Sequence, residues 1–215
     1  MVRLLLIEDH ALVREGLVQT LHQLDTEVEV FAVADSRGAW DLIENERSFD
    51  LILLDLGLPG EDGFSCLRTF SERCPSIPVV ILSAYDDAQS IERAMKNGAA
   101  SFVPKSYSSD RMLAVLREVL AGRVFYPDFR PESSVLAPGH FSVDGDIQPT
   151  TFGLSERKGE VLALMASGKS NREIAELLGL SEGTVKVHLT GIFKRLGVSS
   201  RTQAMVLISR HGVKF

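Results

Sequence analysis

Five short apolar runs alternate with helical patterns along the first 122 residues of the chain. Runs that are so short and so apolar are typical of strands buried on both faces. Their alternation with helices favours a parallel sheet, and right-handed crossovers then divide the helices between its two faces. The sequence therefore predicts an α/β domain of the (βα)5 kind. The expected strands are Val2–Ile7, Val28–Val33, Leu51–Leu54, Val79–Leu82 and Ala100–Val103.

Helical segments with recognisable start and stop residues lie between and after these runs. Ser36 is placed to cap the second helix, and Gly98 and Gly122 follow the fourth and fifth as C-terminal signals. The first domain is expected to span residues 1–122. Its expected helices are His10–Leu24, a segment after Ser36 through Ile43, Phe64–Arg73, Asp87–Asn97 and Ser109–Ala121.

Residues 123–152 differ in composition and are expected to form a linker, because they hold four of the eight prolines with several Gly and Ser residues. From Gly153 onwards the pattern is helical only. Two of the helices are joined by a short turn that contains Gly179, which is the helix-turn-helix pattern. We therefore expect a small all-α helix-turn-helix domain over residues 153–215. Its helices are expected from Ser155 to Gly168, over 170–178 after a capping box, over 181–196, and after Ser199 as a cap.

Charge is distributed unevenly between the two expected domains. Residues 153–215 contain 10 Lys and Arg against 5 Asp and Glu, whereas the rest of the chain contains 13 against 24. A basic module joined to an acidic body is expected to meet a polyanion such as nucleic acid.

The remaining composition favours a cytoplasmic protein. No apolar run approaches the ~18 residues of a membrane span, and the N-terminus lacks the basic region and cleavage site of a signal peptide. Cys66 and Cys74 have no Cys or His cluster around them, so both are predicted to be ordinary thiols in a reducing compartment.

Three carboxylates follow two of the predicted strands. Asp55 follows the third run, and Glu8 and Asp9 follow the first. Asp55 alone reads most simply as the cap of a turn. In the flavodoxin-like strand order 2-1-3-4-5, however, the first and third strands are neighbours, and the carboxylates converge in one crevice. Three carboxylates close together need a cation, and Mg²⁺ is the ion that hard oxygen ligands favour.

The same edge of the sheet offers a hydroxyl and an ammonium group. Ser83 ends the fourth strand and Lys105 follows the fifth. A magnesium ion, an ammonium and a hydroxyl around one carboxylate form a clamp for a transferring phosphoryl group. Asp55 is the expected nucleophile, and an aspartyl phosphate is the expected product.

Residues 1–122 resemble a two-component receiver domain. The resemblance implies that Asp55 accepts phosphate from a histidine kinase, that Asp9, Asp55 and the Gly57 carbonyl ligate Mg²⁺, and that Glu8 acts partly through water. Ser83 and Lys105 would bind the phosphoryl oxygens, and Phe102 matches the aromatic switch residue. The pieces that carry the resemblance are residues 6–9, 54–63, 79–84 and 98–105.

The third helix of the basic module has a narrow apolar stripe with polar residues opposite. Val185, Leu189, Ile192 and Leu196 form the stripe. A helix of this kind fits the major groove, where Lys186 can donate to guanine. The other candidates for base contacts are Val187, His188, Thr190 and Lys194. Lys194 and Arg195 are also candidates for phosphate contacts. The remaining candidates for phosphate contacts are Ser170, Ser181 and Thr184.

Residues 154–210 resemble the LuxR/FixJ-type helix-turn-helix domain over nearly their whole length. The carrying strings are residues 154–157, 161–162, 168–175, 180–188 and 194–198. The resemblance implies that the third helix reads double-stranded DNA and that the fourth, around Arg201–Ser209, carries a homodimer contact. The whole chain therefore resembles a response regulator of the NarL/FixJ subfamily.

We interpret the chain as a DNA-binding transcriptional regulator controlled by phosphorylation, and not as an enzyme. Phosphorylation is expected to act through dimerisation or domain release. A magnesium-dependent phosphatase of the haloacid-dehalogenase type is the first alternative, but that family needs a second Asp where Gly57 stands. The second alternative is a regulator that acts through protein contacts and no longer binds DNA.

Overall fold

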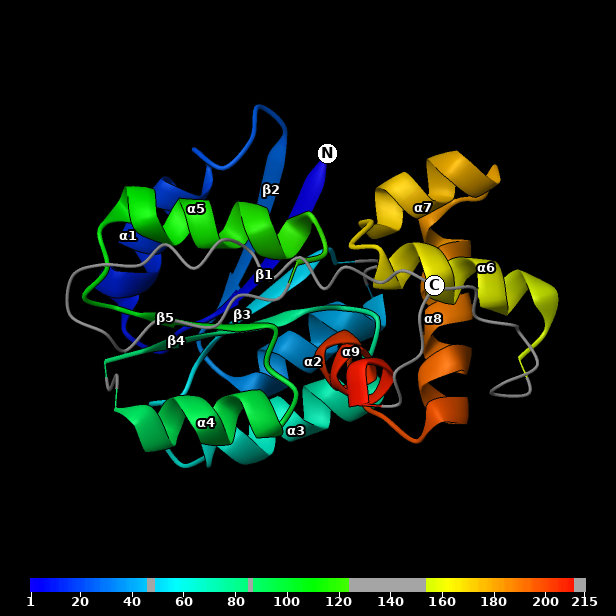
Figure 1. Cartoon of the computed structure of the whole chain (residues 1–215). Coiled ribbons are helices and arrows are strands. Elements are labelled where there is room, and N and C mark those ends of the chain that lie inside the picture. Colours follow the sequence, from blue (N-terminus) through cyan, green and yellow to red (C-terminus); the bar gives the residue numbers. More distant parts are fainter. Residues whose placement is uncertain (46–48, 85–86, 124–153, 211–215) are drawn as a thin grey trace, which may run out of the picture.

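A computed structural model describes residues 1–45, 49–84, 87–123 and 154–210 of the chain. Five parallel strands form one sheet in the order β2-β1-β3-β4-β5 (Figure 1). This confirms the α/β prediction and the flavodoxin-like order. The strands are β1 (Val2–Ile7), β2 (Val28–Val33), β3 (Leu51–Asp55), β4 (Val79–Ser83) and β5 (Ser101–Pro104).

Helices cover both faces of the sheet, as right-handed crossovers require (Figure 1). Helices α1 (Ala11–Leu21) and α5 (Ser109–Leu120) pack on one face, over a core that includes Leu4, Leu53 and Leu116. The opposite face carries three helices over a second apolar core. They are α2 (Ser36–Asn45), α3 (Gly63–Arg73) and α4 (Ala88–Lys96). We refer to residues 1–123 as the sheet domain.

A separate helical domain follows and has its own core. Its helices are α6 (Glu156–Ala166), α7 (Asn171–Leu178), α8 (Glu182–Leu196) and α9 (Arg201–Arg210). Gly179 ends α7 in the left-handed conformation, with φ of 64°, which glycine adopts without strain. This turn sets α8 directly after α7, so the predicted helix-turn-helix is present. Residues 154–210 are called the helical domain below.

Of the five serines predicted to cap helices in these domains, two form the cap and three do not. Ser170 forms the expected capping box with Glu173, and Ser181 accepts a hydrogen bond from the Thr184 amide. Ser36 does not cap α2, because the Asp35 carboxylate accepts from the Gly38 amide at 2.8 Å.

Ser199 does not cap α9 either. Its hydroxyl donates to Gln203 Oε1 at 2.9 Å, and the cap is the next residue, Ser200, which accepts from the Gln203 amide at 3.2 Å. Ser155 precedes α6 but makes no side-chain cap bond. Ser199 and Ser200 are adjacent hydroxyl residues at the start of α9, and the sequence alone does not show which of them caps the helix.

The expected linker over residues 123–152 lies outside the described residues except for Arg123. Within the part of the chain that the structure describes, every helix is too short or too polar to cross a bilayer.

Candidate functional site

The predicted carboxylates meet at the carboxyl ends of β1 and β3. Ile7 pairs with Leu54 in the parallel register, so the next residues, Glu8 and Asp55, are neighbours. Glu8 is fully buried and Asp55 is 4% exposed. Buried carboxylates of this kind need compensation by cations or hydrogen-bond donors. We call Glu8, Asp9 and Asp55 the acidic pocket.

Lys105 provides part of this compensation. Its Nζ lies 2.8 Å from Asp55 Oδ2 and 2.6 Å from Glu8 Oε2. Partial burial lowers the pKa of Lys105, but the hydrogen bond to Asp55, the contact with Glu8 and both carboxylate charges raise the pKa more, to above its ordinary value. The ammonium is therefore held in its charged form beside Asp55. Because the β5 strand places Lys105 at this edge, the structure brings the predicted pair together.

The pocket also has the features of a cation site. Among the described residues, one group of four side chains offers ligand atoms that all lie within 4.8 Å of one another, namely Glu8, Asp9, His10 and Asp55. Asp9 Oδ1 is buried, and His10 Nδ1 lies 3.0 Å from it. Several carboxylates held this close together are costly unless a cation approaches them. The donor set is oxygen-rich and fits Mg²⁺.

Backbone groups fix the loops that carry these ligands. The Gly57 amide donates to Asp55 Oδ1 at 3.1 Å, which orients the carboxylate. Arg14 donates from one guanidinium nitrogen to the carbonyls of Glu8, at 2.8 Å, and Asp9, at 3.1 Å. Arg14 was not singled out from the sequence. Its position one helical turn after His10 was the available signal, since a long donor in the first turns of a helix reaches back to the preceding loop.

Ser83 and Phe102 lie where the sequence placed them, at the ends of β4 and within β5. Ser83 is 2% exposed, and its carbonyl accepts from the Lys105 amide at 2.7 Å. Phe102 is fully buried in the core under α3 and α4. Phe102 therefore packs between the sheet and the helices that cover this face.

Helix α8, the predicted DNA-recognition helix, buries the apolar side that the sequence predicts. Val185, Leu189 and Ile192 are at most 1% exposed. Phe193, which was not predicted from the sequence to be buried, is also 1% exposed. Val187 on the opposite side is 71% exposed. Thr190 and Lys194 are also exposed. A single exposed apolar side chain is common on protein surfaces, so Val187 does not by itself mark a binding surface.

Hydroxyls among the predicted DNA contacts are already engaged within the domain. Ser170 bonds to Glu173, and Ser181 shares a hydrogen bond of 2.8 Å with Thr184. Thr190 Oγ1 donates to the Lys186 carbonyl at 2.9 Å. His188 is half-buried, whereas Arg195 is exposed at the end of α8. The amino ends of α7 and α8 are therefore capped by their own side chains, and each first turn also carries an acidic residue, Glu173 or Glu182.

Lys186 faces the sheet domain instead of solvent. Its Nζ donates to the Phe49 carbonyl at 2.8 Å and to Asp50 Oδ1 at 3.1 Å. The Lys186 side chain is only 13% exposed and that of Asp50 only 24%. Neither Phe49 nor Asp50 was singled out from the sequence. A contact between two domains leaves no periodic pattern in the sequence of either domain.

Further hydrogen bonds join the domains along the same edge. Thr202 and Gln203 of α9 donate to the carbonyls of Ala99 and Lys96, at 3.2 and 3.4 Å. All these acceptors precede β3 or β5, so the helical domain sits at the amino ends of the strands, opposite the acidic pocket. Figure 1 shows this arrangement, with α8 and α9 beside one end of the sheet.

The domain contact is close at two glycines of the sheet domain. A side-chain carbon added at Gly122 would lie 2.9 Å from Arg201 Nη2, and one added at Gly98 would lie 3.2 Å from Ser200 Oγ. Both glycines have positive φ, 81° and 96°. A cavity of about 440 Å³ lies between the two domains and is lined by Asp50 and Arg201 among others. We call this set of contacts the closed arrangement.

Two protein families match the chain. The response regulator receiver domain matches residues 4–117, and the luxR family of bacterial regulatory proteins matches residues 153–208. Together they cover most of the chain and coincide with the sheet domain and the helical domain.

Two individual relatives match across both domains. A glycerol metabolism activator of Pseudomonas putida is 33% identical over 208 residues, covering 96% of this chain and 94% of the relative. The transcriptional regulatory protein LiaR of Bacillus subtilis is 30% identical over 211 residues, covering 98% of each. The crystal structure of a LuxR family DNA-binding response regulator from Silicibacter pomeroyi is 26% identical with a TM-score of 0.53, and the match covers 59% of this chain and 98% of that one.

Proposed function

The chain belongs to the response regulators with a receiver domain and a LuxR-type DNA-binding domain, and from this premise we propose that Asp55 is its phosphoacceptor. Proteins of this family are DNA-binding transcriptional regulators of two-component systems, not enzymes. A histidine kinase is the partner that a receiver domain implies. The observation that carries the proposal is the contact of Asp55 with Lys105 at 2.8 Å, at a strand end lined by Glu8 and Asp9.

Each residue of the pocket has a proposed role in phosphoryl transfer. Asp55 Oδ2, which now accepts from Lys105, would lose that bond as the phosphoryl group arrives, and Lys105 would follow the new phosphoryl oxygen. Ser83 would bind a second phosphoryl oxygen, and Phe102 would repack as Ser83 moves. Glu8, Asp9, Asp55 and the Gly57 carbonyl would hold Mg²⁺, which neutralises charge on the transferring group when it is bound.

The proposed DNA-reading surface is the exposed side of α8. Val187 and Thr190 would meet base edges, Lys186 would donate to guanine, and Lys194 and Arg195 would contact phosphates. His188 flanks these residues. Ser170, Ser181 and Thr184 would add phosphate contacts at the capped ends of α7 and α8. Helix α9 would carry the contact of a homodimer on two half-sites.

The closed arrangement is incompatible with this use of α8. Lys186 cannot donate to a base while its ammonium is bound to Phe49 and Asp50, and α9 is engaged with the α4–β5 turn. We therefore propose that phosphorylation at Asp55 favours an open arrangement in which α8 and α9 are free. The added charge acts on a bistable sheet domain and shifts the ratio of closed to open molecules.

Phosphoryl uptake on the purified full chain tests the proposed site. The wild type is expected to incorporate phosphate from a small phosphodonor in the presence of Mg²⁺, and Asp55→Asn is expected to incorporate none. Removal of Mg²⁺ with a chelator should stop the reaction. Incorporation that persists in Asp55→Asn, or that does not depend on a divalent ion, would show that another residue or another chemistry is involved.

A further inference from the structure

His10 lies at the rim of the acidic pocket and has no part in the roles described so far. Its Nδ1 is 3.0 Å from Asp9 Oδ1 and 3.3 Å from Glu8 Oε1. Although His10 is the residue before α1, its imidazole makes no capping bond to the helix. The side chain is 68% exposed. The imidazole therefore has one edge at the carboxylates and the other in water.

The position of the imidazole is set by the backbone around it. The His10 amide donates to Glu8 Oε1 at 3.3 Å, and Arg14 holds the carbonyls of the two preceding residues. A nitrogen donor is thereby placed among carboxylate oxygens, all within 4.8 Å of one another. Asp9 Oδ1, 3.0 Å from His10 Nδ1, is the nearest of these oxygens to His10. A cation in contact with that oxygen lies within reach of the imidazole.

We propose that His10 is a metal ligand of the acidic pocket and makes it selective for divalent first-row transition ions over Mg²⁺. The inference rests on the proposed function, because it concerns the same cation site. Imidazole nitrogen binds Co²⁺, Ni²⁺ and Zn²⁺ well, whereas Mg²⁺ prefers oxygen ligands and keeps its waters. Carboxylates alone give a smaller preference of this kind, and the imidazole is expected to widen it.

The opposite role for His10 predicts an opposite effect. If the imidazole only donates hydrogen bonds to the carboxylates, it competes with every cation for the same oxygens. Removing it would then strengthen the binding of Mg²⁺ and of transition ions alike. Ligation predicts a loss that is confined to the ions that favour nitrogen. The sign and the selectivity of the effect therefore separate the two roles.

Titration calorimetry of the full chain with Co²⁺ and with Mg²⁺ tests the proposal. His10→Ala is expected to weaken Co²⁺ binding about tenfold, as the loss of a well-placed ligand contact does, and to change Mg²⁺ binding by less than about twofold. The matched control is His22→Ala, which removes an exposed histidine just after α1 and should change neither. The visible absorption of bound Co²⁺ should also change in His10→Ala, because the spectrum reports its ligands.

Three results would overturn the proposal. The first is a Co²⁺ affinity unchanged in His10→Ala, and the second is an equal loss or gain for both ions. The third is Co²⁺ binding that keeps its wild-type affinity in Asp9→Ala, which would place the ion outside the acidic pocket. None of these would remove the proposed function as long as Mg²⁺ still supports phosphoryl uptake at Asp55. Failure of uptake in the wild type would instead remove the function itself.

Discussion

Asp50→Asn is expected to raise the DNA affinity of the unphosphorylated protein. The substitution acts from the sheet domain, so it leaves every residue of the DNA-reading helix in place. In the wild type, the Arg3 amide donates a hydrogen bond to Asp50 Oδ2 at 2.9 Å. The side-chain oxygen of asparagine can accept the same hydrogen bond. What the variant loses is the charge that faces the Lys186 ammonium. The closed arrangement is weakened while the fold of the sheet domain is kept.

The size of the effect follows from the burial of the pair. Exposed ion pairs contribute about 0 to 1 kcal/mol, and hydrogen bonds to charged groups contribute about 1.5 to 3 kcal/mol. The Lys186 and Asp50 side chains are 13% and 24% exposed, which places the pair between these limits. The asparagine oxygen is used by the Arg3 amide, so Lys186 keeps only its hydrogen bond to the Phe49 carbonyl at 2.8 Å. We expect a loss of about 1 kcal/mol, or about a fivefold shift from closed to open molecules.

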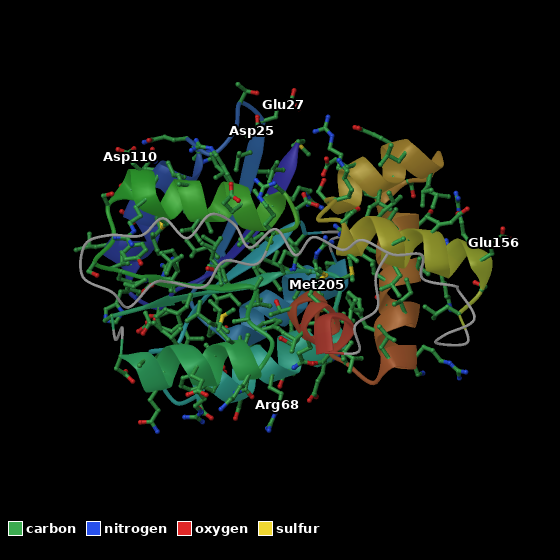
Figure 2. The ribbon with its side chains drawn as sticks, in the orientation of Figure 1. Asp25, Glu27, Arg68, Asp110, Glu156 and Met205 are labelled. Atoms are coloured by element: carbon green, nitrogen blue, oxygen red, sulfur yellow. The ribbon has the colours of Figure 1, made fainter. Side chains whose placement is uncertain are left out.

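Fluorescence anisotropy with labelled operator-like DNA measures this shift in the full chain. Asp50→Asn is expected to bind about fivefold more tightly than the wild type without phosphate, and about equally once beryllofluoride has opened both. The control is Asp110→Asn, which removes the same charge at the far side of the sheet domain (Figure 2). Equal gains in both variants would indicate a general charge effect. No gain in Asp50→Asn would refute the closed arrangement as the inhibitory contact.

Three further predictions concern the pocket, a cap and a thiol. Arg14→Ala, which removes the bonds to the Glu8 and Asp9 carbonyls, should weaken Mg²⁺ binding several-fold, up to about tenfold, in calorimetry. An unchanged Mg²⁺ affinity would mean that the loop holds its shape alone. The Ser170 amide bond lowers the pKa of Glu173, so its stabilisation is present above the ordinary pKa of 4.5 and lost as pH falls through the lower folded value. Glu173→Gln should therefore speed hydrogen exchange in α7 at pH 7 but not in acid, and an equal effect at both pH values would contradict this. Burial raises the pKa of Cys66 to about 12, which leaves about one thiolate in 10,000 at pH 8, so iodoacetamide should modify Cys66 only on unfolding; rapid labelling of the native protein would be the contrary result.

Much of the sheet domain and its pocket could be predicted because the signals are local. Apolar runs such as Leu51–Leu54 mark buried strands, and the parallel order then fixes which strand ends are neighbours. Glu8 and Asp55 could be paired on that basis before any contact was seen. Lys105 followed for the same reason, as the first residue beyond β5.

The contact between the domains could not be predicted in the same way. Phe49 offers a carbonyl to Lys186, and a backbone carbonyl carries no sequence signal at all. Asp50 directly precedes β3, and nothing in its position distinguishes it from the other acidic residues of the chain. The docking depends on the shapes of two folded surfaces, which are set only after each core has formed. Phe193 was missed because it lies beside the narrow apolar stripe that the helical period predicts for α8. Its burial makes the apolar side of α8 wider than that stripe.

The central claim is that modification of Asp55 controls the access of α8 to DNA. The most direct measurement is the DNA affinity of the full wild-type chain with and without beryllofluoride and Mg²⁺, beside Asp55→Asn under the same conditions. We expect tighter binding on beryllofluoride addition in the wild type and no response in Asp55→Asn. Equal affinity in the wild type with and without beryllofluoride, at saturation of the acidic pocket, would contradict it.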